Sequence, residues 1–132
     1  MLKTACVFRE RRPEDGIRVC TMSRLTDETW LNPERELAKG AGIDYWVRCL
    51  SPPEKSVGQY YRGRLTFEDL MDIYRTHLAK PELREELVHW SMRALKENVT
   101  LTCYEFTPEK CHRRILVQEC KLLVPALEIL IE

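Results

Sequence analysis

Short apolar or β-branched runs separated by turns are the first regular pattern along this chain. Such runs predict strands over residues 2–8, 17–22 and 99–104, and residues 43–50 form a third strand or an irregular extended segment. Asp15-Gly16 is a strong turn pair between the first two strands. Residues 126–131 are typical of a last strand, although a helical ending fits them nearly as well.

Apolar residues at helical spacing, bounded by capping residues, predict the helices. They cover residues 33–39, 66–79 and 81–97, with Asn32 and Gly40 at the ends of the first. The glycines Gly58 and Gly63 predict that residues 56–64 form a loop. Because strands alternate with helices, the pattern predicts an α/β fold. We expect one three-layer domain, with a mainly parallel sheet of about four to five strands and helices on both faces.

The segment from Val99 to Arg114, VTLTCYEFTPEKCHRR, carries the densest chemistry in the chain. Thr107 as N-cap and Pro108 at the first helical position predict a helix over residues 108–123. The first turn of that helix would direct backbone N–H groups, the Cys111 thiol and the His112 imidazole beyond the end of the preceding strand. The sequence therefore predicts a site at this strand-to-helix turn.

Cationic residues follow the predicted strands. In a parallel sheet the residues after each strand share one edge, which would bring Arg9, Arg24 and Arg113 together. We therefore predict that these three arginines bind an anion at the carboxyl edge. The alternative is that the arginines are solvated surface charges paired with nearby carboxylates such as Asp15 and Glu109.

Three stretches resemble the domain-of-unknown-function 488 family, small bacterial and archaeal proteins without an established activity. They are the Ile17-Arg18-Val19 strand with Ser23-Arg24, the helix around Tyr74 and Leu78, and CYEFTPEKCHRRIL. The resemblance covers nearly the whole chain and implies a site but no reaction. One family branch matches in order at Cys103, Glu105, Pro108, Cys111, His112 and Arg113.

The resemblance puts His112 first among the candidates, because another branch keeps only this histidine. The second strand of the family usually ends with an acid near the arginine. Here Ser23 precedes Arg24 instead, which disfavours any role that needs a carboxylate at this place.

Each candidate residue has a functional and a structural interpretation. Cys111, near cations and a helix start, is a nucleophile or redox thiol, or else a packing residue. His112 is a general acid or base or a phosphate donor, or else it bonds to the adjacent loop. Glu105 orients His112 or pairs with Arg24, and Cys103 belongs with these orienting residues or in the core.

We predict no metal and no cofactor. The chain contains no CxxC pair, and adjacent residues such as Cys111 and His112 are expected to point their side chains apart, which disfavours zinc.

Length and composition limit the function classes. The 132 residues form one domain, 1–132, long enough to bury roughly two thirds of its unfolded surface. Six cysteines without an apolar leader predict a cytoplasmic protein with reduced thiols. The zero formal charge implies no bulk attraction to nucleic acid or anionic lipid, and no apolar run is long enough to span a membrane.

These observations leave three hypotheses of different classes open. The first is a binding or small enzyme domain for a phosphate-bearing metabolite or nucleotide. The second is a nucleic-acid-associated module whose phosphate track is Arg9, Arg11, Arg12, Arg62 and Arg64. The third is a structural or oligomeric interaction domain without a ligand. The neutral net charge disfavours the second, the clustered turn disfavours the third, and the oligomeric state stays open.

Overall fold

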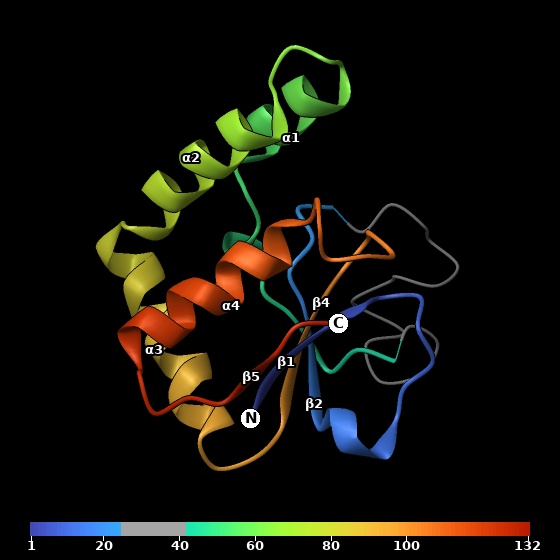
Figure 1. Cartoon of the computed structure of the whole chain (residues 1–132), viewed down its shortest axis with the longest axis vertical. Coiled ribbons are helices and arrows are strands. Elements are labelled where there is room, and N and C mark those ends of the chain that lie inside the picture. The colour runs from blue at the N-terminus through green and yellow to red at the C-terminus, as the bar shows by residue number, and fades with distance from the viewer. Residues whose placement is uncertain (25–41) are drawn as a thin grey trace.

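The computed structural model describes residues 1–24 and 42–132, and its centre is a five-stranded parallel sheet (Figure 1). The strands are β1 (Leu2–Cys6), β2 (Ile17–Cys20), β3 (Tyr45–Trp46), β4 (Val99–Cys103) and β5 (Ile129–Leu130), in the spatial order β3-β2-β4-β1-β5. Every pairing between neighbours is parallel, so the carboxyl ends of the strands meet at one edge. The predicted α/β class and parallel sheet are confirmed.

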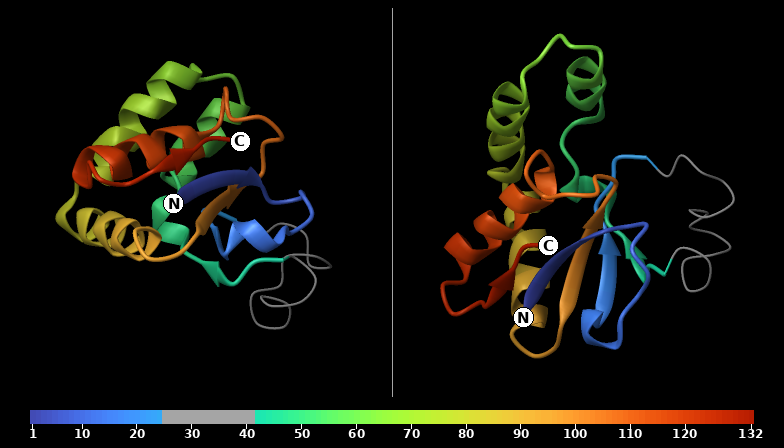
Figure 2. Two further views of the ribbon diagram at one scale, coloured as in Figure 1. Left: turned by 60° about the horizontal axis from the view of Figure 1, so that its bottom comes forward. Right: turned by 45° about the vertical axis from the view of Figure 1, so that its right-hand side comes forward.

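The helices α2 (Phe67–Leu78), α3 (Pro81–Ala94) and α4 (His112–Leu123) lie on one side of the sheet (Figure 2). The helix α1 (Glu54–Tyr61) lies beyond the carboxyl edge. The predicted helical layer on the second face is not present in residues 1–24 and 42–132. The helix expected over residues 33–39 lies outside the described residues.

Side chains alternate between the two faces of the strands and so build two different interiors. Leu2, Val19 and Leu101 join α2, α3 and α4 in the main apolar core. The opposite face combines a smaller apolar cluster, which includes Cys20, Met22 and Ile43, with several buried polar groups. There Thr100 Oγ1 donates a hydrogen bond to the carbonyl oxygen of Asp15 at 2.7 Å, and the Arg18 guanidinium donates to backbone carbonyls after β1.

Two element predictions are wrong at the carboxyl edge. Residues 56–64 were expected to form a loop, but most of them belong to α1, because Gly58 is accommodated inside the helix at a cost of about 1 kcal/mol. Gly63, with φ of +73°, follows the end of that helix. The helix expected from Pro108 begins at His112, since Cys111 has extended backbone angles (φ −134°, ψ 139°) and is the N-cap.

A short parallel strand lies two residues before the end of the described chain. Residues 126–131 were expected to form a strand or a helix, and the structure has the strand β5 beside β1. Residues 43–50, expected to be extended or irregular, contain β3 and the short 3-10 helix η2 (Arg48–Leu50).

Candidate functional site at the carboxyl edge of the sheet

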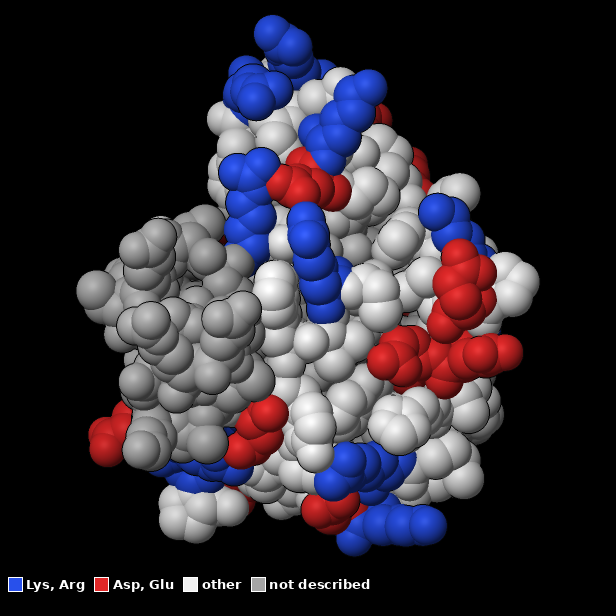
Figure 3. Space-filling model, turned by 180° about the vertical axis from the view of Figure 1, so that it is seen from behind, with Lys and Arg blue, Asp and Glu red and all other residues white. Residues whose placement is uncertain are grey.

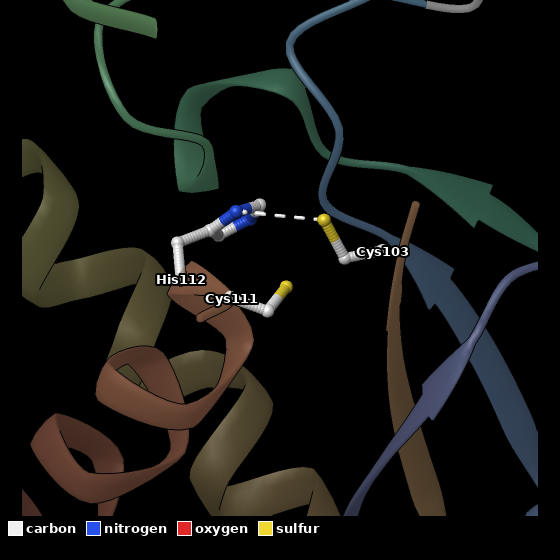
Figure 4. A group of neighbouring side chains, drawn as sticks. All are labelled: Cys103, Cys111 and His112. Carbon is white, nitrogen blue, oxygen red and sulfur yellow. Dashed lines mark hydrogen bonds between the residues drawn. The ribbon is translucent and has the colours of Figure 1, made fainter. Parts of the chain in front are cut away.

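Two thiols and an imidazole converge where β4 ends and α4 begins (Figure 4). Cys103 is the last residue of β4, Cys111 is the N-cap of α4, and His112 is its first residue. Their two sulfur atoms and one ring nitrogen lie within 4.8 Å of one another. We call these three residues the Cys-Cys-His cluster.

The expectation that Cys111 and His112 point apart is wrong. Cys111 is still extended whereas His112 is helical, so the backbone turns between them and both side chains face the end of β4. Sequence adjacency predicts divergence only where both residues share one regular conformation.

Thr21, just after β2, fixes the ring of His112. The Nε2 atom lies 3.0 Å from the Thr21 carbonyl oxygen and 3.2 Å from Thr21 Oγ1. Because a carbonyl oxygen can only accept, Nε2 donates in this contact, and Nδ1 is directed toward the sulfur atoms. Nδ1 lies 3.5 Å from Cys103 Sγ, and the edge-to-face contact of His112 with Tyr74, at 5.4 Å between centroids, holds the ring plane.

The pKa values of the two thiols of the cluster are shifted in opposite directions. A hydrogen bond from the Cys103 thiol and the adjacent His112 lower the pKa of Cys111, against the effect of its burial. The same hydrogen bond to Cys111, together with burial, raises the pKa of Cys103 well above its usual range. The pair therefore favours a Cys111 thiolate beside a protonated Cys103.

A cavity of about 760 Å³ opens beside the cluster. Cys103 and His112 are in its wall, but Cys111 is not, and only 2% of Cys111 is exposed. A smaller cavity, of about 40 Å³, borders all three residues. The thiol predicted to be the nucleophile is thus the one screened from the large cavity.

Basic side chains line the mouth of the large cavity. Arg24, Lys55 and Arg62 belong to its wall, together with the rings of Tyr61 and Tyr104. Figure 3 shows basic side chains gathered at the upper end of the molecule, where α1 lies. Among the described residues of the wall, the one carboxylate is that of Glu54, which is held by Arg24 and also by Arg48 at 2.8 Å.

The predicted anion-binding arginines do not converge. Arg24 lines the cavity, whereas Arg9 pairs with Asp15 at 2.7 Å and does not line it. Arg113 is fully buried and donates to the carbonyl oxygens of Glu105, Phe106 and Glu132. A parallel sheet brings strand ends to one edge, but it does not decide in which direction each following side chain points.

Glu105 has a different partner from the two predicted. Its carboxylate accepts a hydrogen bond from the Tyr61 hydroxyl at 2.7 Å and contacts neither His112 nor Arg24. Thr21 takes the orienting role instead, and sequence inspection missed it because a carbonyl after a strand carries no residue-type signal. Lys55 was missed because the predicted anion site included only cations that follow strands, whereas Lys55 lies in α1.

A comparison with models of known protein families gives a match over most of the chain. A family model described as the active DUF488-N3 subclade matches residues 2–121. The chain belongs to the DUF488 family. The DUF488 match contains Thr21 and the whole Cys-Cys-His cluster, and the resemblance seen in the sequence is confirmed. No curated protein and no solved structure matches the chain.

Two further observations concern the cysteines and the helices of this DUF488 protein. All six cysteines are free thiols in the structure. Over residues 1–24 and 42–132, no helix has the length and apolar character needed to cross a membrane.

Proposed function

We propose that this protein binds a small anionic, phosphate-bearing molecule in the large cavity and acts on it through the Cys-Cys-His cluster. The observation that carries the proposal is that one cavity wall contains both the cations Arg24, Lys55 and Arg62 and the groups Cys103 and His112. A volume of about 760 Å³ is within the range of cavities that hold metabolites and nucleotides.

Charge supports an anionic ligand. Lys55 and Arg62 form no ion pair with any residue in the described ranges. The only carboxylate that these ranges contribute to the wall, that of Glu54, is already held by two arginines. The exposed rings of Tyr61 and Tyr104 offer flat apolar surfaces in the same wall, which suit a ligand that also carries a base or another ring.

The cluster supplies reactive groups beside the bound molecule. In the metal-free protein Cys103 and His112 reach the cavity, where a thiol and an imidazole 3.5 Å apart can exchange protons with a bound molecule. Cys111 lies behind them, where its thiolate accepts the hydrogen bond of the Cys103 thiol.

Thermal unfolding of metal-free protein with inorganic phosphate, pyrophosphate or a nucleoside monophosphate, at constant ionic strength, tests the proposal. We expect at least one of these anions to raise the melting temperature through binding to the folded state. The response should be lost in Lys55→Ala/Arg62→Ala and reduced in Arg24→Ala.

The matched control is Arg64→Ala/Lys80→Ala, which removes two exposed cations that do not line the cavity. This variant should respond like the wild-type protein. The proposal is wrong if none of the anions stabilises the wild-type protein, or if both double variants respond equally.

A further inference from the structure

We propose that Cys103, Cys111 and His112 bind a zinc ion, with the fourth coordination position open to the large cavity. This inference goes beyond the proposed function, since zinc binding requires no anion and can be tested without one.

The first argument is the spacing of the donor atoms. Zinc bonds of about 2.3 Å to sulfur and 2.0–2.1 Å to nitrogen at tetrahedral angles place these two donors roughly 3.6 Å apart. Cys103 Sγ and His112 Nδ1 are 3.5 Å apart. All three donors already lie within 4.8 Å of one another, so closing the set around one ion needs a movement of roughly 1 Å.

The second argument is the orientation of His112, because a thiol–imidazole hydrogen bond alone would also give a separation of 3.5 Å. Histidines that bind metals usually donate the other ring N–H to a carboxylate or carbonyl, which fixes the tautomer. His112 Nε2 has the carbonyl oxygen of Thr21 at 3.0 Å and donates to it, so Nδ1, on the side of the two sulfurs, is the nitrogen available to a metal.

The third argument is the position of the open side. Two thiolates and one imidazole form a donor set that zinc uses, and catalytic zinc sites keep a fourth position for water or substrate. Cys103 and His112 border the large cavity while Cys111 lies behind them, so the uncoordinated side of the ion faces the cavity. On binding, any thiol proton still present passes to solvent and both sulfurs coordinate as thiolates.

Metal titration of the reduced, metal-free full chain tests the proposal. We expect one Zn²⁺ per chain, measured by competition with a chromophoric chelator. Co²⁺ should give thiolate-to-cobalt charge transfer together with the d–d bands of tetrahedral coordination. The variants Cys103→Ser, Cys111→Ser and His112→Gln should each weaken Zn²⁺ binding by at least about tenfold.

The control is Cys49→Ser, which removes an exposed thiol outside the cluster and should leave binding unchanged. Circular dichroism checks that each variant is folded. The cobalt spectrum is recorded on the wild-type protein, so the zinc proposal can still be tested if a variant fails to fold.

Three outcomes would overturn the inference. They are no Zn²⁺ or Co²⁺ binding by protein with verified free thiols, equal binding in the cluster variants, or loss of binding in Cys49→Ser. The anion experiment uses metal-free protein and cavity variants outside the cluster, so failure of either proposal is recognised separately.

Discussion

At the scale of single residues, cysteine acidity in this protein depends on the neighbours of each thiol. Cys120, on the buried side of α4, is surrounded by the apolar core, and burial raises the pKa of its thiol to about 11. Cys111, at the start of the same helix, has a lowered pKa because the Cys103 thiol and His112 stabilise its thiolate. The local donors, rather than burial, decide the charge at the site.

We therefore predict that the Cys111 thiol is ionised at neutral pH but reacts slowly with reagents in solution, because it is buried. Metal-free protein should show thiolate absorbance in the ultraviolet at neutral pH that Cys111→Ser removes and Cys49→Ser keeps. Iodoacetamide should nevertheless label Cys49 faster than Cys111, since Cys49 is exposed and only 2% of Cys111 is. Peptide mass spectrometry measures both rates, and fastest labelling at Cys111 would contradict the described burial.

The same pKa shift has a consequence for stability. Because the pKa of Cys111 is lower in the folded protein than in the unfolded chain, its ionisation stabilises the fold at neutral pH. That contribution is lost as pH falls through the folded-state pKa. The difference in unfolding free energy between wild-type protein and Cys111→Ser should therefore narrow in acid.

At the scale of elements, the connection between β4 and α4 positions the site. The guanidinium of Arg113 is fully buried and donates to Glu105 and Phe106 within this connection, and to Glu132 at the end of the chain. Arg113 thereby links the connection between β4 and α4 to Glu132, which follows β5. We therefore expect Arg113 to stabilise this connection rather than to contact an anion.

Replacement of Arg113 should accordingly cost stability in the absence of any ligand. Arg113→Met leaves buried carbonyl oxygens without donors, and we expect a loss of about 2–3 kcal/mol in unfolding free energy, measured by urea denaturation. The matched change at its exposed neighbour, Arg114→Met, should stay within about 0.5 kcal/mol. An unchanged ligand-free stability in Arg113→Met would restore the anion-binding role.

At the scale of the whole molecule, the arginines of the predicted nucleic-acid track divide into two groups. Arg9, Arg11 and Arg12 lie after β1 and form ion pairs with Asp15, Asp44 and Glu132. Arg62 and Arg64 follow α1 and form no ion pair with described residues. Few charges of this track therefore remain available for phosphate contacts.

We therefore expect weak binding to DNA and RNA with a shallow dependence on salt. A track that neutralises Z phosphates of duplex DNA gives a log–log slope of about −0.9Z, so two or three available cations predict a slope no steeper than about −3. Fluorescence anisotropy of labelled duplex and single strands over a salt series measures it. Tight binding at physiological ionic strength with a slope near −6 would favour the nucleic-acid hypothesis.

The sequence by itself determined the features that depend on local pattern. Strands that alternate with helices predicted the parallel α/β class. Apolar residues at helical spacing predicted a helix over residues 66–79, and the structure has it as α2, with the Thr66 side chain as the N-cap that accepts from the Asp69 N–H. The cysteines and histidine after β4 marked the site because such residues cluster visibly along the chain. These features are set by interactions between residues that are near in sequence.

Only the tertiary structure decided which of those residues face one another. Thr21 contacts His112 across 91 positions of sequence. Arg113, which was predicted to bind an anion at the sheet edge, is buried against the carbonyl oxygens of Glu105, eight positions before it, and Glu132, 19 positions after it. Cys111 lies beside Cys103 because Cys111 itself is extended and α4 starts only at His112. Where the helix starts depends on how it packs against the sheet. Side-chain direction at the end of an element depends on such long-range packing, which local sequence patterns do not encode.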